Sequence, residues 1–413
     1  MHQKTIHPHT WILVFICSFL ALVTDGGDLM LLSYSLQNIR ADFGLTQTQS
    51  GLLGTVTLAG MAIGGIFGGW ACDRFGRVRT IVLSVGSFSV LTALLGFTQN
   101  VWQFGALRFC ASLGLGSVYI AANTLMAEYV PNRYRTTVLG TLQAGWSVGY
   151  IVATLLAKHI VDPEIAASWR PLFFVAGVPV ILAVIMHFFV PEPASWVENR
   201  NKSAQRSENK KEQSTWNMLF SDRTATIMFI LWAITAGCLQ FGYYGVGTWM
   251  PSYLEKEMGL KFKDMAGYMV GSYTAMILGK ILAGYFADKF GRRVMYAFGA
   301  IGTAVFIPII IFLHTPGNIL WLLIIFGFLY GVPYGVNATY MTESFETKFR
   351  GTAIGGAYNI GRLGGAVAPV VIGYFADRIS FGAGFLVMGV AYFFCGLIPA
   401  LFIKDKLHDP QKA

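Results

Sequence analysis

The chain has 413 residues, of which 54% are hydrophobic and only 12% charged, and its formal net charge is +9. This composition excludes a soluble globular protein, in which about a quarter of the residues are charged. It predicts a membrane protein instead.

Apolar runs follow one another along the whole chain. A helix needs about 20 mostly apolar residues to cross a bilayer, and twelve such runs lie between polar breaks. We therefore predict an all-α membrane protein with twelve transmembrane helices. The first run, from Trp11 to about Leu36, lacks a small-residue cleavage site and is interpreted as a retained helix. The expected centres are Val23, Gly60, Ser89, Gly114, Val148, Val180, Ala236, Ile277, Ile309, Phe328, Gly364 and Val390.

The positions of the basic residues explain the net charge. Most of the 30 Lys and Arg lie at the N-terminus, in the even-numbered connections and in the C-terminal tail. Because cytoplasmic loops are enriched in Lys and Arg, both termini are predicted to be cytoplasmic. We expect a multi-pass protein of a bacterial inner membrane, with the lipid bilayer and no nucleic acid as a partner.

The longest polar stretch, residues 191–223, separates six spans from six and has the composition of a linker. The predicted domains are a six-helix half at 1–190, a cytoplasmic linker at 191–223 and a second six-helix half at 224–413.

A shift of 215 residues aligns the two halves. It places "GWACDRFGR", which begins at Gly69, on "GYFADKFGR", which begins at Gly284. One offset that holds over about 70 residues indicates internal duplication and two pseudo-symmetric halves. The same shift pairs Asp73 with Asp288, Glu128 with Glu343, Arg135 with Arg350 and Gly140 with Gly355.

These repeated sequences resemble a known family. "GGWACDRFGRVR" and "GYFADKFGRR" are similar to the paired loop signature of the major facilitator superfamily, and "EYVPNRYR" and "ESFETKFR" to its companion cytoplasmic signature. Val78 departs from the pattern, because a second basic residue is usual there. The resemblance covers essentially all twelve spans and implies the major facilitator fold with a cytoplasmic latch. The gating residues predicted are Gly69, Asp73, Arg74, Arg77, Glu128, Arg135, Gly284, Asp288, Arg292, Glu343 and Arg350.

The latch has a physical interpretation. Gly69 and Gly284 would allow close helix approach, while the aspartates at the helix ends would pair with Arg135 and Arg350 or accept hydrogen bonds from helix N-termini. The alternative is a tight loop whose basic residues only fix the topology.

Five charged residues within the spans break the repeat. The shift places Asp25, Asp28, Arg108, Lys280 and Arg362 opposite Gln240, Tyr243, Leu323, Gly65 and Ser147. Each ionised side chain near mid-membrane costs about 2.5 to 3.5 kcal/mol, so these residues are expected to face a polar cavity between the two halves. Residues present once are candidates for the substrate site.

Three cations beside two acids predict an organic anion as the substrate. Arg binds a carboxylate bidentately and Lys supplies a point charge, while nearby rings suit a planar acid. An internal ion pair with an aspartate remains the alternative for both arginines. The predicted substrate-binding residues are Arg108, Arg362, Lys280, Gln143, Gln240, Tyr243, Tyr358 and Asn359.

The first span contains "TDGGDLM", in which Asp25 and Asp28 share one helix face. Two close carboxylates do not both ionise easily, so both are predicted proton-coupling residues. The sequence leaves open which one carries the proton and whether the other only pairs with an arginine. Gly26 and Gly27 would let a neighbouring helix or the substrate approach.

"DGGD" resembles the DGxD pattern of the aromatic acid:proton symporter branch of the superfamily, and "FGYYGVGTWMP" and "GRLGGAVAP" agree with it. Within that branch the chain is most similar to cis,cis-muconate permeases. The resemblance implies proton-coupled import, by alternating access and as a monomer, of cis,cis-muconate or a benzoate-like acid from aromatic hydrocarbon catabolism.

Three rival functions fit the sequence less well. In a sugar:proton symporter an arginine would replace Ser195 of "PEPASW", and a drug:proton antiporter would carry Gly-Pro where "AGWS" has Trp146. An enzyme or an ATP-driven pump is not expected, because no GxxxxGK[ST] sequence occurs. No cofactor or metal site is predicted, since the five cysteines and seven histidines are scattered.

Overall fold

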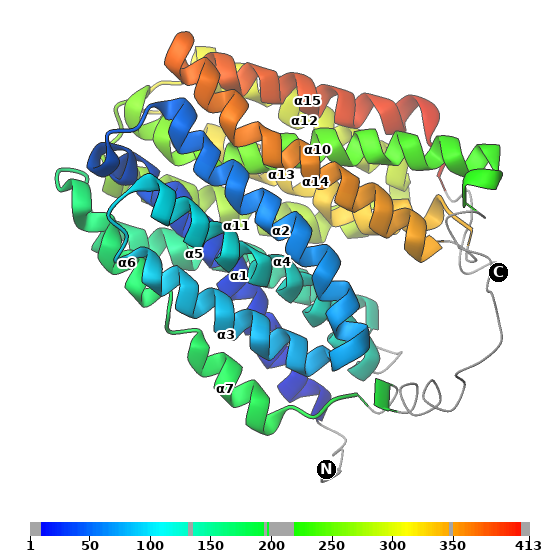
Figure 1. Ribbon diagram of the computed structural model, residues 1–413. Helices are drawn as coiled ribbons and strands as arrows, with labels where there is room; N and C mark the ends of the chain where they lie inside the picture. The colour runs from blue at the N-terminus through cyan, green and yellow to red at the C-terminus, as the bar shows by residue number, and fades with distance from the viewer. Residues whose placement is uncertain (1–9, 131–134, 194–195, 198–218, 347–349, 406–413) are drawn as a thin grey trace. The chain divides into compact units, whose positions relative to one another are not determined.

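The structure is a computed structural model that describes residues 10–130, 135–193, 196–197, 219–346 and 350–405. Within these ranges every regular element is helical (Figure 1). The helices are α1 (Thr10–Phe43), α2 (Gln47–Phe75), α3 (Arg77–Leu95), α4 (Val101–Tyr129), α5 (Arg135–Ile160), η2 (Ala166–Ser168), α6 (Trp169–Val175), α7 (Val180–Phe189), α10 (Arg223–Lys256), α11 (Phe262–Phe290), α12 (Arg292–Leu313), α13 (Ile319–Glu343), α14 (Arg350–Arg378) and α15 (Phe381–Phe402). The predicted all-helical class is confirmed.

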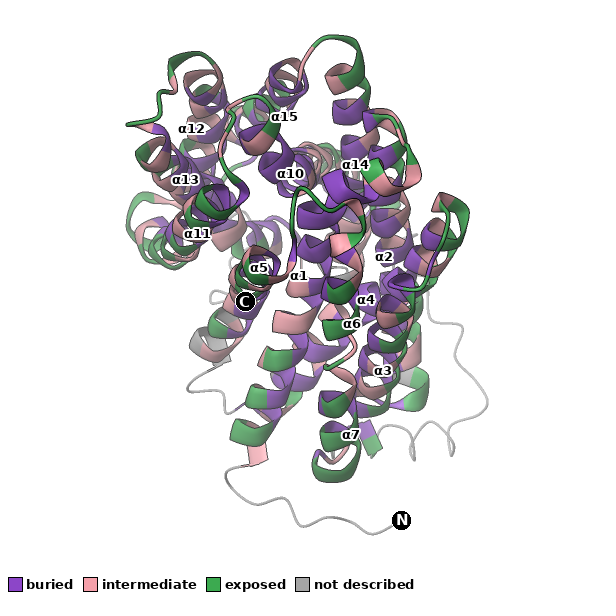
Figure 2. Ribbon diagram, turned by 90° about the vertical axis from the view of Figure 1, so that its left-hand side faces the viewer, coloured by how far each residue is buried: buried purple, intermediate pink, exposed green. Residues whose placement is uncertain are grey.

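Ten helical segments of the described residues are long and apolar enough to cross a membrane. Their outer faces carry large apolar side chains, such as Leu83 at 68% exposure and Phe67 at 63%, whereas Asp25 and Arg108 are fully buried. Figure 2 shows such exposed outer faces along α3 and α7. A protein surrounded by lipid exposes apolar side chains and buries charged ones, and this structure does both. Over their described residues, α5 and α14 do not meet both criteria.

The described residues form two compact units. Unit 1 takes in those of Met1–Gly44 and Val56–Lys210, and unit 2 those of Leu45–Thr55 and Lys211–Ala413. In unit 1, α1 packs on α5 and α3 packs on α4. In unit 2, α10 packs on α14 and α12 packs on α13. These two pairings are those of unit 1 shifted by 215 residues.

The first turns of α2 lie with unit 2. Asp377, near the end of α14, accepts hydrogen bonds from the amides of Gln47 (2.9 Å) and Thr48 (2.7 Å). A carboxylate at a helix N-terminus is stabilising, so this contact ties α2 to α14. The prediction had grouped these residues with the N-terminal half. The domain boundaries stay a prediction, and linker residues 198–218 lie outside the described ranges.

Single glycines join α2 to α3 and α11 to α12. Gly76 has φ 114° and Gly291 has φ 95°, values that L-residues with side chains rarely adopt.

The helices that follow these two glycines, α3 and α12, are each capped by a carboxylate. In both units that carboxylate lies beyond the last helix of the unit. Glu192 accepts hydrogen bonds from the Val78 amide (3.1 Å) and the Arg79 amide (2.9 Å). Asp405 accepts one from the Arg293 amide (2.7 Å). The negative charge complements the helix dipole at both places. These caps were not predicted.

The sixth predicted span is broken. Helix α6 ends at Val175 and α7 begins at Val180, the residue expected at the centre of the span. Gly177 and Pro179 lie between them, and both disfavour a helix interior, since proline lacks an amide donor and glycine loses more backbone entropy.

Candidate functional site

A buried ion pair joins α1 to α4 in unit 1. The Arg108 guanidinium donates through Nη1 to Asp28 Oδ2 at 2.7 Å and through Nη2 to the Asp28 carbonyl oxygen at 3.2 Å. Its Nε donates to Thr57 Oγ1 of α2 at 3.1 Å. The side chains of Arg108 and Asp28 are 0% and 3% exposed. The internal ion pair that the sequence left open for Arg108 is therefore present.

Asp25 precedes Asp28 by three residues on α1 and is 0% exposed. Asp28 directs one oxygen at Arg108, while its other oxygen has no hydrogen-bond partner among the described residues. Asp28 is thus engaged by Arg108, and the proton-coupling role of Asp25 stays a prediction.

The glycines between these acids let α1 approach α5 closely. A Cβ at Gly26 would collide with the main-chain carbonyl of Trp146, and a Cβ at Gly149 would collide with the Val23 carbonyl. Of the two roles considered for the glycine pair, the structure therefore supports helix approach. This contact restricts the rotation of α1, the helix that carries both aspartates.

Replacing Gly26 by alanine is therefore expected to lower stability. The added methyl group must push α5 away, and overpacking of this kind costs about 1 to 3 kcal/mol. Gly237→Ala is the matched control, because no atom of the described residues lies within 4 Å of a Cβ placed there. Thermal unfolding in detergent should show a lower midpoint for the first variant only. Equal midpoints would contradict the packing described.

A second polar contact in unit 1 joins α4 to α5. Gln143 Nε2 donates to Asn123 Oδ1 at 2.7 Å. One turn earlier on α4 and one turn later on α5, the rings of Tyr119 and Trp146 meet edge to face with centroids 5.8 Å apart. Gln143, a predicted substrate-binding residue, is thus held by a neighbouring helix.

Unit 2 places both of its mid-helix cations over tyrosine rings. Lys280 Nζ lies 5.8 Å from the ring centroid of Tyr334, and Arg362 Cζ lies 5.8 Å from that of Tyr358. These distances are within the range of cation–π attraction. Arg362 is 7% exposed, and Lys280 is half-buried.

An aromatic cluster continues from Tyr334. The Tyr243 ring lies 4.4 Å from that of Tyr334 and stacks on that of Tyr330 at 4.9 Å. Gln240 Nε2 donates to the Tyr358 carbonyl oxygen at 2.9 Å, which ties α10 to α14 beside Arg362. Five of the predicted substrate-binding residues are thus held in one neighbourhood of unit 2, namely Gln240, Tyr243, Lys280, Tyr358 and Arg362.

Asn359, another predicted substrate-binding residue, is engaged within its own helix. Its Nδ2 donates to the Gly355 carbonyl oxygen at 2.8 Å. This bond leaves the amide oxygen, which has no hydrogen-bond partner among the described residues.

Two of the predicted gating residues in each unit, an arginine and a glutamate, form the same contacts in both units. Arg77 Nε donates to Glu128 at 2.9 Å and its Nη1 to the Cys72 carbonyl oxygen at 2.9 Å. At an offset of 215, Arg292 Nε donates to Glu343 at 3.2 Å and its Nη1 to the Ala287 carbonyl oxygen at 2.8 Å. The repeat in the sequence is thus a repeat of charge pairs.

Other gating predictions fare differently. Asp288, near the end of α11, pairs with Arg292, the first residue of α12, at 2.6 Å, and its side chain is 74% exposed. Arg74 lies over the Trp70 ring at 5.3 Å. The side chains of Asp73, Arg135 and Arg350 lie outside the described residues, so the predicted aspartate–arginine pairs stay predictions.

The described residues do not show the close helix approach predicted at Gly69 and Gly284, since none of their atoms lies within 4 Å of a Cβ placed at either position. The close approaches occur earlier along the same helices, where a Cβ at Gly64 would collide with the Leu113 carbonyl and one at Gly279 with that of Phe328. These two glycines are also 215 residues apart, so the repeat held a signal that was missed.

The second charge pair is the more buried. The Arg292 and Glu343 side chains are 11% and 7% exposed, against 13% and 21% for Arg77 and Glu128. We expect Glu343→Gln to lower the thermal midpoint more than Glu128→Gln, because a less hydrated guanidinium loses its buried carboxylate partner and keeps only the exposed Asp288. The reverse order, measured in the same detergent, would contradict this expectation.

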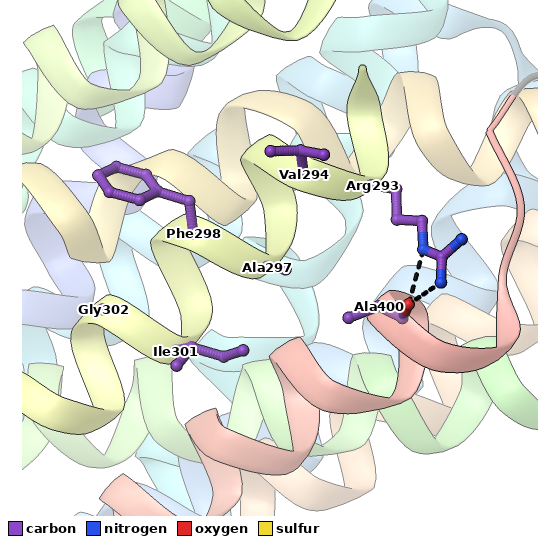
Figure 3. A pocket seen from close by; sticks show the side chains of 7 residues that line it. All are labelled: Arg293, Val294, Ala297, Phe298, Ile301, Gly302 and Ala400. Carbon is purple, nitrogen blue, oxygen red and sulfur yellow. Dashed lines mark hydrogen bonds between the residues drawn. The ribbon is translucent and has the colours of Figure 1, made fainter. Parts of the chain in front are cut away.

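Figure 3 shows a pocket between α12 and α15 with a volume of about 570 Å³. Its lining is apolar except for Arg293, whose Nε donates to the Ala400 carbonyl oxygen at 2.6 Å. None of the predicted substrate-binding residues lines it, and its walls offer a carboxylate little to bind. The lining residues are Arg293, Val294, Ala297, Phe298, Ile301, Gly302 and Ala400.

Known proteins share both the sequence and the fold. Residues 14–273 and 263–413 match the family model of the Major Facilitator Superfamily. The chain is 66% identical over 411 residues to the cis,cis-muconate transport protein of Acinetobacter baylyi, which covers 100% of the chain and 98% of that protein.

Two further similarities are more distant. The benzoate transport protein of the same organism is 22% identical over 440 residues, covering 99% of the chain and 93% of that protein. A crystal structure of a D-xylose-proton symporter superposes with a TM-score of 0.79 at 18% identity, covering 96% of this chain and 99% of that chain. At that identity the structural likeness shows the fold alone.

Proposed function

The chain belongs to the major facilitator superfamily, and we propose that it imports the dicarboxylate cis,cis-muconate, or a benzoate-like aromatic acid, together with protons. It is a transporter and not an enzyme. The observation that carries the substrate class is the pair of mid-helix cations in unit 2, Lys280 and Arg362, each over a tyrosine ring. The relatives that transport muconate and benzoate support the same class.

Asp25 is the proposed carrier of the coupling proton. It is fully buried, and Asp28, three residues further along α1, is engaged in the ion pair with Arg108. Arg108 therefore acts mainly by positioning Asp28, with the substrate carboxylates left to the cations of unit 2. This assignment narrows the prediction in which both acids couple and all three cations bind substrate.

The membrane arrangement proposed is twelve spans in two pseudo-symmetric six-helix halves, with both termini cytoplasmic in a bacterial inner membrane. The helix pairings and charge pairs that recur at an offset of 215 support the duplication, and the distribution of Lys and Arg supports the orientation. The protein would function as a monomer.

Transport would proceed by alternating access, and the charge pairs beside the repeated loops would act as the latch. Arg77 with Glu128 and Arg292 with Glu343 hold helix ends together in their own units. Breaking and re-forming such contacts would accompany each change of access.

Radiolabelled uptake by cells expressing the protein tests the function. The panel is cis,cis-muconate, benzoate, hydroxybenzoates, succinate and glucose, each with and without an uncoupler. We expect accumulation of muconate or an aromatic acid that the uncoupler abolishes. Accumulation of glucose alone, or export of a cationic dye, would favour the sugar or drug transporter instead.

A further inference from the structure

Basic side chains occupy the middle of unit 2, and the acids lie elsewhere. Lys280 lies ten residues before the end of α11, and Arg362 lies twelve residues after the start of α14. Every Asp and Glu of residues 224–402 lies in a connection or within three residues of a helix end. The helix centres of this unit are therefore cationic, and charge at that depth marks a functional site.

The two cations lie at similar depths. At 1.5 Å per residue, Lys280 is about 15 Å from the end of α11, and Arg362 is about 18 Å from the start of α14. In the proposed topology, the end of α11 and the start of α14 both lie at the cytoplasmic side of the membrane. A ligand that contacts both side chains would therefore lie nearly parallel to the membrane plane.

A continuous aromatic surface connects the two positions. Tyr334, whose ring faces the Lys280 ammonium group, contacts Tyr243 at 4.4 Å, and Tyr243 contacts Tyr244 at 5.5 Å between ring centroids. Tyr244 packs against Gly365, where a Cβ would lie 2.6 Å from the ring. Gly365 follows Arg362 by three residues on α14, so it lies on the same face.

The third mid-membrane cation, Arg108, belongs to unit 1. Its guanidinium donates to Asp28 through two nitrogens and to Thr57 through the third. Unit 2 offers a dianionic ligand two positive charges at similar depths.

We infer that Lys280 and Arg362 each bind one carboxylate of a dicarboxylate substrate across the tyrosine surface, and that Lys280 sets the preference for a dianion over a monoanion. The inference rests on the proposed function and deepens it. Rings behind the cations suit the flat conjugated chain that joins the two carboxylates of muconate.

The test compares two ligands that share one carbon skeleton. The monomethyl ester of cis,cis-muconate keeps the diene and loses one charge. We expect Lys280→Met to lower kcat/KM for muconate uptake about tenfold or more, because a charge-assisted contact is lost. Uptake of the monoester should change less than twofold, which also shows that the variant is folded. Lys280→Arg should keep the preference for the dianion.

The matched control is Lys263→Met, since Lys263 is an exposed lysine at the start of the same helix. It should leave both ligands unaffected. If Lys280→Met lowers uptake of both compounds equally, or of neither, the inference is overturned while the proposed function stands. If the wild-type protein takes up neither compound, the proposed function itself fails and the inference fails with it.

Discussion

Asp25→Asn is expected to abolish the accumulation of muconate against its gradient without abolishing its exchange across the membrane. An amide cannot take up or release a proton, so substrate movement loses its link to the pH gradient. One pH unit supplies about 1.4 kcal/mol per coupled proton, which corresponds to tenfold accumulation. In proteoliposomes at zero membrane voltage and one unit inside-alkaline, the ratio should fall from about tenfold or more to about onefold.

Exchange of labelled for unlabelled muconate checks that the Asp25 variant is still a carrier. Exchange needs access to both sides but no net proton movement, so it should persist. Asp264→Asn, at an exposed position near the start of α11, serves as the control and should accumulate substrate normally. Normal accumulation by Asp25→Asn would show that this residue does not carry the coupling proton.

Arg108→Met is expected to destabilise the protein by about 3 to 5 kcal/mol, because it strands the Asp28 charge in a fully buried position. The thermal midpoint in detergent and the yield of folded protein should both fall. Replacing Asp28 by asparagine in the same chain removes the stranded charge. The double variant should therefore recover most of the lost stability.

Arg79→Met controls for the loss of an arginine at an exposed position and should change the midpoint little. A contrary result would be an Arg108→Met protein with a normal midpoint and a raised KM for substrate. That outcome would show that Arg108 binds substrate and that its ion pair with Asp28 does not stabilise the fold.

The repeat made part of the structure predictable from the sequence. Glu128 and Glu343 keep the same offset as Arg77 and Arg292, and the structure joins each glutamate to the arginine of its own unit. Duplicated residues have duplicated surroundings, so their pairing follows from alignment of the halves. The helical class was predictable for a different reason, the length of the apolar runs.

Contacts made once were harder to predict. The pairing of Arg108 with Asp28 and Thr57 depends on how three helices are rotated and how deeply each lies. Hydropathy gives neither quantity, and a single threonine in an apolar run carries no signal of its own. Glu192 caps α3 but lies in the stretch predicted to be a linker. The cap was not predictable, because the contact spans more than 100 residues of chain.

Proton movement during substrate entry tests the central claim most directly. The purified protein is placed in liposomes with equal pH on both sides, and cis,cis-muconate is added outside while an external dye reports pH. Coupled import predicts that the external medium becomes more alkaline as muconate enters, and that Asp25→Asn removes this signal. Entry of muconate with no proton uptake, or with protons moving outward, would contradict proton-coupled import.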